Sequence, residues 1–264
     1  MTGPRRNLKD LIEIMERLLA PGGCPWDREQ TPKSLTPFAI EEAHELAEAI
    51  ERGDLDGTKE ELGDLLLQVV FHTCLTKRDG KFDLGDVIQR ICEKLVHRHP
   101  HVFGDQIAET ADEVLKNWNE IKGKEKAKKI LVNVDNPLGI PKTLPALQRS
   151  QKIGDKTKNL KFDWASPQEV LNKVEEEFGE LKQAFASGNK EHTLEELGDV
   201  FFVLAQLARH LKGEAESIAR AANRKFESRF SKLLELAKSR NLKIETLSVW
   251  EKEKLWQEVK KLKS

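Results

Sequence analysis

The chain has 264 residues, which is enough for two domains of ordinary size, each with its own core. Charged residues make up 34% of the sequence and hydrophobic residues 38%, a balance typical of a soluble, helix-rich protein. Lysine plus arginine (44) and aspartate plus glutamate (45) nearly cancel, leaving a net charge of −1. This balance provides no global field that would favour a nucleic acid or a membrane surface as partner.

Cysteine usage and hydropathy indicate a cytoplasmic protein. The cysteines are odd in number and scattered, and no two form a Cys-x-x-Cys pair: Cys24, Cys74 and Cys92. A disulfide framework or a thiolate zinc site is therefore not expected. The first residues lead into a charged amphipathic segment without an apolar signal core, and no apolar run approaches membrane-spanning length.

Apolar periodicity predicts five helices in the first half of the chain. The expected helices span residues 8–19, 36–53, 58–76, 84–97 and 112–126. Pro21-Gly22-Gly23 ends the first helix, and Cys24-Pro25-Trp26-Asp27 is expected to follow as a loop. The fourth helix must end before Pro100.

A lysine-rich run and a proline- and glycine-containing segment predict a linker over residues 126–142. The order of parts then repeats: a helix over 144–153, a loop with Phe162-Asp163-Trp164, an acidic helix, an apolar helix over 193–211, a basic helix and a terminal helix. No segment predicts a strand. We expect an all-α fold of two tandem homologous helical bundles, an N-terminal domain over residues 1–125 and a C-terminal domain over 143–264.

An acidic motif occurs twice, with the second copy 135 residues after the first. The first copy is Glu41-Glu42-x-x-Glu45 followed by Glu61-Leu62-Gly63-Asp64. The second copy is Glu176-Glu177-x-x-Glu180 followed by Glu196-Leu197-Gly198-Asp199. A duplication at a fixed offset predicts two copies of one structural unit.

Helical spacing predicts that the carboxylates of each copy converge. Glu42 and Glu45 are three residues apart, as are Glu61 and Asp64, so each pair lies on one helix face. A turn at Gly53-Asp54 folds the two helices back on each other. Four converging carboxylates repel one another at neutral pH, and a hard divalent cation is the usual remedy. The sequence therefore predicts a metal site.

Structural explanations for these carboxylates remain open at this point. Thr58-x-x-Glu61 and Thr193-x-x-Glu196 match a capping box, which would close a helix N-terminus. Glu41, Glu42 and Glu45 would also suit a solvated helix face. A cap does not explain Asp64, which lies in a nearly continuous apolar segment, where an unpaired carboxylate is costly.

Each half also carries a basic pair one helical turn apart and a turn that combines tryptophan with lysine. These residues are Lys94, Arg98, Trp118 and Lys122 in the first half and Lys225, Arg229, Trp256 and Lys260 in the second. Oxygen-ligated Mg²⁺ completes its shell with substrate phosphates, and lysine and arginine neutralise phosphate charge. The combination favours a nucleotide polyphosphate as ligand. The alternatives are helix packing for the tryptophans and solvated surface for the basic pairs.

Together these motifs resemble the MazG family of nucleoside triphosphate pyrophosphohydrolases, within the all-α NTP pyrophosphatase superfamily, in its two-domain form. The resemblance covers essentially the whole chain. Besides the acidic motifs it rests on Cys24-Pro25-Trp26-Asp27, Arg98-His99-Pro100-His101-Val102-Phe103 and Phe162-Asp163-Trp164. It implies Mg²⁺-dependent hydrolysis of NTP to NMP and pyrophosphate by a homodimer, in nucleotide-pool house-cleaning or alarmone control. Apolar segments such as Val200–Leu204 favour the same dimer.

The resemblance also implies roles for individual residues. The implied metal ligands are Glu177, Glu180, Glu196 and Asp199, with Glu42, Glu45, Glu61 and Asp64 at the matching positions. The implied catalytic group is Glu176, Glu177 and Glu180, with Glu176 acting around the attacking water or just outside the ligand shell. The implied nucleotide contacts are Lys173, Glu176, Glu195, Lys225, Arg229, Trp256 and Lys260, with Lys94, Arg98, Trp118 and Lys122 in the first half. Two positions depart from the pattern: Phe38 aligns with Lys173, and His192 stands where the family has lysine.

We expect the second half to carry most of the activity, because a triphosphate brings about four negative charges to an already acidic site. Only the second half places a lysine, Lys173, one turn before the acidic motif. The alternative, above all for the first half, is a non-catalytic nucleotide-sensing or partner-binding bundle. A di-iron bundle would need paired Glu-x-x-His motifs, and the second copy has Gly179 where the first has His44.

Overall fold

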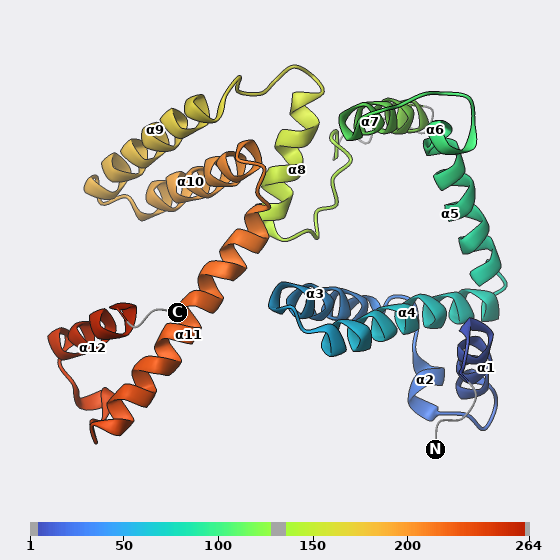
Figure 1. Cartoon of the computed structure of the whole chain (residues 1–264), viewed down its shortest axis with the longest axis horizontal. Coiled ribbons are helices and arrows are strands. Elements are labelled where there is room, and N and C mark those ends of the chain that lie inside the picture. The colour runs from blue at the N-terminus through green and yellow to red at the C-terminus, as the bar shows by residue number, and fades with distance from the viewer. Residues whose placement is uncertain (1–4, 128–135, 262–264) are drawn as a thin grey trace. The chain divides into compact units, whose positions relative to one another are not determined.

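The computed structural model describes residues 5–127 and 136–261, and every regular element in these ranges is a helix (Figure 1). The predicted all-α fold is confirmed. The chain divides into two compact units, Met1–Ile130 and Leu131–Ser264. Part of the expected linker, residues 128–135, lies outside the described residues, and the domain limits at 125 and 143 stay predictions. Among the described helices, none combines the length and apolar character that crossing a membrane requires.

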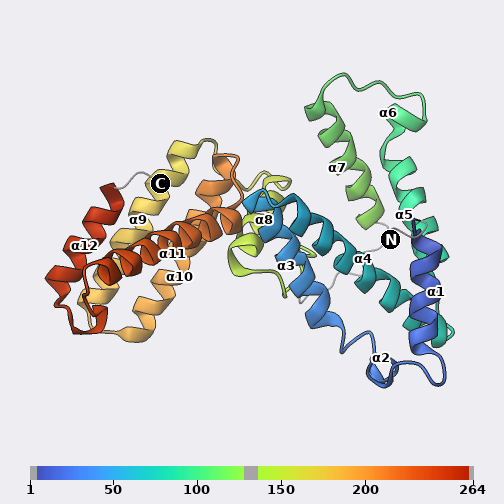
Figure 2. The same cartoon turned by 60° about the horizontal axis from the view of Figure 1, so that its bottom comes forward.

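The first unit is built on an antiparallel hairpin of two long helices. Its helices are α1 (Leu8–Leu19), α2 (Pro25–Glu29), α3 (Thr36–Arg52), α4 (Leu55–Arg78), α5 (Leu84–Arg98), α6 (Pro100–Phe103) and α7 (Ala111–Ala127). Gly53 ends α3 in the left-handed conformation with φ 70°, and α3 and α4 lie side by side in Figures 1 and 2. α1 packs on α4 around buried Met15, Val70 and Leu75.

The second unit repeats this arrangement. Its elements are α8 (Ala146–Lys158), α9 (Pro167–Ala186), α10 (Lys190–His210), α11 (Ala215–Ser239), the short 3₁₀ helix η1 (Ile244–Thr246) and α12 (Val249–Lys261). α9 and α10 form the hairpin, α8 packs on α10 as α1 does on α4, and α12 packs on α11 as α7 does on α5. A second core cluster between α11 and α12 contains Leu233, Ala237, Leu255 and Val259.

The capping-box explanation for the acidic residues is wrong. α4 is capped by Asp54, whose Oδ1 accepts a hydrogen bond from the Gly57 backbone N–H at 2.9 Å. Asn189 caps α10 in the same way. Thr58 and Thr193 therefore lie inside their helices, and the glutamates three residues after them lie deeper still. Neither glutamate closes a helix N-terminus, which removes one structural explanation for the acidic motif.

Two short segments also differ from expectation. Pro25 occupies the first position of α2, where its fixed φ suits a helix and its missing N–H costs nothing, so the expected loop begins a short helix. Pro100 likewise starts α6, directly after α5 has ended. Both corrections come from proline acting as a helix starter where the sequence pattern marked only an interruption.

Candidate functional site

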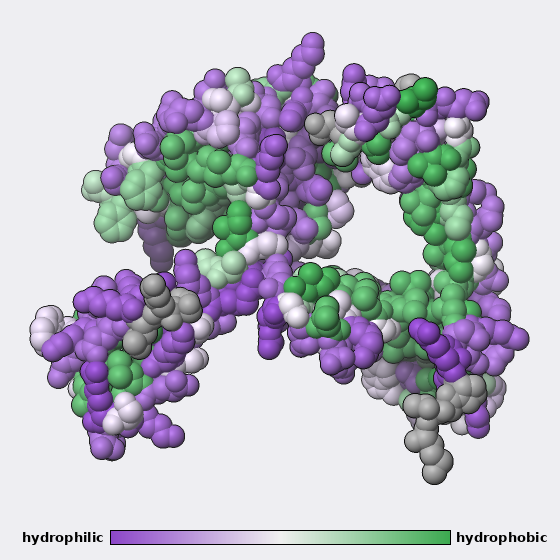
Figure 3. All heavy atoms as spheres, viewed as in Figure 1, coloured by the Kyte–Doolittle hydropathy of each residue, from purple (hydrophilic) through white to green (hydrophobic). Residues whose placement is uncertain are grey.

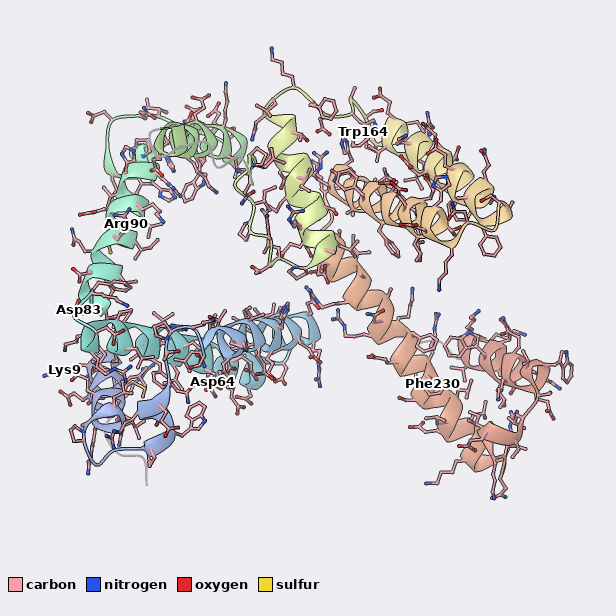
Figure 4. The ribbon with its side chains drawn as sticks, turned by 180° about the vertical axis from the view of Figure 1, so that it is seen from behind. Lys9, Asp64, Asp83, Arg90, Trp164 and Phe230 are labelled. Atoms are coloured by element: carbon pink, nitrogen blue, oxygen red, sulfur yellow. The ribbon has the colours of Figure 1, made fainter. Side chains whose placement is uncertain are left out.

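Each helical hairpin carries a cluster of three carboxylates. The members are Glu42, Glu61 and Asp64 in the first unit and Glu177, Glu196 and Asp199 in the second. In each cluster one oxygen from every residue lies within 4.8 Å of the others. Figure 4 shows Asp64 on the α3–α4 hairpin. The antiparallel turn and the three-residue spacing on α4 and α10 produce this convergence, as the sequence predicts.

The fourth predicted ligand of each half lies next to the cluster rather than within it. Glu45 is close enough for its charge to raise the pKa of both Glu42 and Glu61. Glu180 is likewise close enough to Glu177 for the charge of Glu177 to raise its pKa, after the effect of lost hydration. The structure therefore brings three of the four predicted ligands into mutual reach in each unit, with the fourth beside them.

Electrostatic repulsion is built into both clusters. Loss of hydration, followed by the neighbouring carboxylate charges, raises the pKa of Glu42 and of Glu61. Loss of hydration and the charge of Glu177 raise the pKa of Glu180. A set of hard oxygen donors under mutual repulsion fits a hard divalent cation, which would relieve it. These residues could hold such an ion in either unit.

A lysine already partly neutralises the second cluster. Lys173 Nζ lies 2.8 Å from Glu176 Oε1 and 2.9 Å from Glu177 Oε1, and these bonds raise the pKa of Lys173. In the first unit Phe38 occupies the matching place on α3, and its ring meets the Trp26 ring edge-on at 6.0 Å between centroids. The two clusters thus share their carboxylates and differ in the cation beside them.

His192 and Glu195 lie on the first turns of α10, at the rim of the second cluster. His192 Nδ1 is 3.4 Å from Glu196 Oε1 and 3.8 Å from Glu195 Oε2. The Glu195 side chain is exposed. The structure therefore places His192 against a predicted metal ligand, Glu196.

The remaining predicted contacts of the second unit form a separate group on α11 and α12. Lys225 and Arg229 lie one turn apart on α11, and Trp256 and Lys260 lie one turn apart on α12. The Trp256 ring is 5.2 Å from the Phe226 ring, and Lys260 Nζ lies 6.0 Å from the Trp256 ring centroid. Among the described helices, α12 packs extensively on α11. The structure therefore places these four residues on two helices that pack together, a different helix pair from the one that carries the carboxylates.

The first unit has an equivalent group on α5 and α7, with one addition. The predicted members are Lys94, Arg98, Trp118 and Lys122. Arg98 lies over the Trp118 ring at 5.2 Å and forms a two-pronged ion pair with Glu125, with Nε 3.2 Å from Oε1 and Nη2 bonded to Oε2. The hydrogen bonds from Arg98 hold the pKa of Glu125 below its usual value. No sequence motif marks Glu125, and the repeat has lysine at the corresponding place, Lys263.

Comparison with known proteins finds the same duplication. The model of the MazG nucleotide pyrophosphohydrolase domain matches residues 30–103 and again residues 165–234. The chain belongs to the MazG nucleotide pyrophosphohydrolase family. Both matches contain an acidic cluster and a basic pair, and both end before the tryptophan helices α7 and α12. The resemblance seen in the motifs is confirmed.

Full-length relatives of the MazG family are similar to this chain from end to end. It is 42% identical over 256 residues to the nucleoside triphosphate pyrophosphohydrolase of Escherichia coli K12, covering 95% of this chain and 96% of the relative. It is 42% identical over 254 residues to the nucleoside triphosphate pyrophosphohydrolase/pyrophosphatase MazG of Thermotoga maritima, covering 96% and 95%. A crystal structure of a MazG-related protein from T. maritima covers 44% of this chain and 99% of its own, with 34% identity and a TM-score of 0.39.

One polar residue beside the first MazG cluster had no sequence signal. Gln68 lies one turn after Asp64 on α4, is 8% exposed, and has a buried Oε1 without a hydrogen-bond partner among the described residues. In the second unit the matching residue is Val203, which is buried in the hydrophobic core. A lone glutamine in an apolar run does not reveal from sequence that it faces inward.

Proposed function

We propose that this protein hydrolyses nucleoside triphosphates to nucleoside monophosphates and pyrophosphate with Mg²⁺, chiefly in its second MazG domain. Family membership and two full-length relatives named nucleoside triphosphate pyrophosphohydrolase support the reaction. The main structural support for placing the reaction in the second domain is the cluster of Glu177, Glu196 and Asp199. Lys173 forms an ion pair with Glu177 at the edge of this cluster. Glu180 completes the proposed set of ligands.

The donor set suits Mg²⁺ because it consists of carboxylate oxygens alone. Mg²⁺ is commonly held by a few carboxylates and keeps coordination positions for water and substrate phosphates. When bound, the ion would supply a Lewis acid for the α-phosphate and lower the pKa of a coordinated water. The corresponding ligands proposed for the first domain are Glu42, Glu45, Glu61 and Asp64.

The protein's own side chains would position the substrate and neutralise its charge. Lys173 is poised to exchange a carboxylate partner for a substrate phosphate oxygen, which is a charge-assisted hydrogen bond. Glu176, bonded to that lysine and 58% exposed, would orient the attacking water. Lys225 and Arg229 would bind the remaining phosphates, with Glu195, Trp256 and Lys260 around them. Attack of the water oxygen on the α-phosphorus breaks the bond to the bridging oxygen, and pyrophosphate leaves in line.

We also propose a homodimer. Large apolar side chains of the second hairpin are exposed in a single chain, among them Phe178 (49%), Phe201 (54%) and Leu204 (42%). Figure 3 shows hydrophobic residues gathered over α9 and α10. A patch of this kind on an isolated chain marks an association surface. Light scattering at micromolar concentration should give twice the chain mass of 30.1 kDa, and a monomer mass would contradict the dimer.

The proposed cellular role is nucleotide-pool house-cleaning or alarmone control in the cytoplasm. All three cysteines are free thiols, which fits a reducing compartment. Neither a membrane nor a nucleic acid is a proposed partner, because the charges of the chain nearly balance.

A second function is proposed for the first domain alone, namely nucleotide sensing without turnover. Its carboxylate cluster is present, but Phe38 stands where the second domain has Lys173, and Arg98 is already paired with Glu125. Such a site would hold a metal and bind nucleotide weakly. It would regulate the other domain or a partner rather than hydrolyse substrate.

Product analysis tests the main proposal. The protein is incubated with Mg²⁺ and each of the common nucleoside triphosphates, and the products are separated. NMP and pyrophosphate are expected, and turnover should vanish in Glu177→Gln but persist in Glu175→Gln, its exposed neighbour outside the cluster. Formation of NDP and phosphate, or binding without hydrolysis, would contradict the proposal.

A further inference from the structure

A buried glutamine of the first unit, Gln68 on α4, lacks a hydrogen-bond partner for its side-chain oxygen. The residue is 8% exposed, and no described residue donates a hydrogen bond to Oε1. A buried acceptor without a donor costs free energy, and native proteins keep few of them. In the second unit the corresponding residue is Val203, a buried apolar residue. The hairpin therefore folds without a polar group at this place, and the amide of Gln68 calls for another explanation.

Gln68 continues the row of side chains that carries the carboxylates of the first cluster. Glu61, Asp64 and Gln68 are separated by three and four residues, so they lie on one face of α4. This face is turned toward α3, because an oxygen of Glu42 on α3 lies within 4.8 Å of oxygens of Glu61 and Asp64. Phe71, the next residue of the row, belongs to the hydrophobic core. Gln68 thus lies between the carboxylate cluster and the apolar core.

The amide of Gln68 is within reach of the cluster. Residues one turn apart on a helix have Cβ atoms about 5–6 Å apart. Long side chains on a helix lean toward its N-terminus, over the residues three and four positions before. For Gln68 the residue four positions before is Asp64. In the other direction the row continues with Phe71, whose side chain has no hydrogen-bond donor. The polar neighbours of the amide in this row are therefore the carboxylates.

Carboxylates alone do not satisfy this amide oxygen. When ionised they only accept hydrogen bonds, so they cannot donate one to Oε1. A hard divalent cation would satisfy both, because carboxylate and amide carbonyl oxygens are among its usual ligands. The amide adds an oxygen without adding a negative charge. This matters in the first cluster, where lost hydration and then the neighbouring carboxylates already raise the pKa of Glu42 and of Glu61.

We infer that Gln68 Oε1 is an uncharged ligand of the cation held by Glu42, Glu61 and Asp64 in the first domain. The inference rests on the proposed function, since it takes that cluster to bind a divalent cation. It gives the first domain one protein oxygen more than the second, where Val203 offers none. The two metal sites therefore differ in how much of the coordination shell the protein fills and how much it leaves to water and substrate phosphates.

Binding of Mn²⁺ to the full-length protein tests the inference. Mn²⁺ takes the same kinds of oxygen ligand as Mg²⁺, and its electron paramagnetic resonance signal reports the unbound ion. Glu196→Gln together with Asp199→Asn removes two of the three carboxylates of the second cluster, so that the titration reports the first site. In this background Gln68→Leu should weaken Mn²⁺ binding about tenfold. The hairpin should tolerate leucine, because the second unit has valine at the corresponding place.

The variant Gln68→Glu distinguishes a ligand from a glutamine that only supports packing. It keeps nearly the same shape and makes the ligating oxygen anionic, so Mn²⁺ binding should tighten by a similar factor. Gln89→Leu, at an exposed glutamine on α5, is the matched control and should bind Mn²⁺ like its parent. Unchanged affinity in Gln68→Leu would overturn the inference. Weaker binding in Gln68→Glu would do the same, because it is the result expected of a purely structural amide.

Thermal unfolding gives a second readout that needs no turnover. The rise in melting temperature caused by a fixed Mn²⁺ concentration should be smaller in Gln68→Leu, and larger in Gln68→Glu, than in their common parent. The reason is that an ion stabilises the folded state in proportion to the logarithm of its affinity. Equal rises in the three proteins would contradict the assignment of Gln68.

The proposed reaction is judged separately, by the NMP and pyrophosphate that the unmodified protein forms. If it hydrolyses no triphosphate, the proposed reaction fails, and the Mn²⁺ titration still decides whether Gln68 is a ligand. If it does hydrolyse triphosphates and Gln68→Leu binds Mn²⁺ like its parent, only the role of Gln68 fails. A first site that binds no Mn²⁺ in the parent would overturn the role of Gln68 together with the metal site proposed for the first domain.

Discussion

The two MazG domains carry the same carboxylate triangle in different surroundings. In the first domain Phe38 lies beside the cluster, and Arg98 is engaged by Glu125. In the second, Lys173 is bonded to the cluster, and Glu177 is 7% exposed. Because both domains have the three clustered carboxylates, both could hold a metal ion. The basic side chains beside each cluster would then determine how tightly a substrate phosphate binds. From this comparison we propose that metal binding is duplicated and that phosphate binding is concentrated in the second domain.

The largest effect should follow removal of a carboxylate from the second triangle. Asp199→Asn should reduce ATP turnover at least about a hundredfold. The loss of an anionic ligand lowers the affinity for the metal ion on which the proposed reaction depends. The metal-free variant should melt slightly higher than the metal-free parent, since one repelling charge is gone. Asp64→Asn is the matched variant in the first domain and should retain most turnover. Full Mg²⁺-dependent activity in Asp199→Asn would refute the metal assignment.

Exchanging the residues that distinguish the domains should sharpen the comparison. Lys173→Phe should weaken substrate use about tenfold to a hundredfold, the value of one charged hydrogen bond. The readout is kcat/KM for ATP, with Lys182→Phe on the same helix as the control, since Lys182 lies over the Phe178 ring away from the cluster. Equal losses in the two variants would show that position 173 has no special role.

The loops before the two hairpins should differ in their response to acid. The hydrogen bonds from Arg209 lower the pKa of Asp163 to about 2. A carboxylate whose pKa is lowered in the folded protein stabilises the fold at any pH above its pKa in the unfolded chain. This stabilisation is lost as the pH falls through its pKa in the folded protein. In the first domain Arg78 holds the matching loop through the backbone carbonyls of Arg28 and Gln30, which do not titrate.

Asp163→Asn should therefore destabilise the second domain at neutral pH by about 2 kcal/mol. Urea unfolding measured from pH 7 to pH 2 should show the variant and parent converging as pH falls below about 4. Asp155→Asn, an exposed aspartate on α8, serves as the control. A difference between variant and parent that is independent of pH would contradict the assignment.

The smallest effect is expected at Glu125. Glu125→Gln should free Arg98 for phosphate and tighten nucleotide binding to the first domain by up to about fivefold, because a partly exposed ion pair contributes little. The affinity is best measured in the Asp199→Asn background, where the second site is disabled. Glu120→Gln, on the exposed side of α7, is the control. Weaker nucleotide binding in Glu125→Gln would mean that Glu125 positions Arg98 for the phosphate rather than competing with the phosphate for it.

The carboxylate clusters could be predicted because they depend on local spacing and one turn. Glu61 and Asp64 share a helix face by their separation alone, and the turn at Gly53 brings Glu42 opposite them. The partner of Arg98 could not be predicted, since Glu125 arrives from another helix through tertiary packing.

The most direct measurement is the turnover of ATP by Glu45→Gln and Glu180→Gln in the full-length protein with saturating Mg²⁺. Each variant neutralises the carboxylate beside one triangle without changing the other. We predict that Glu180→Gln loses most of the activity and that Glu45→Gln keeps most of it, because phosphate handling is concentrated in the second domain. A larger loss in Glu45→Gln would reverse the assignment.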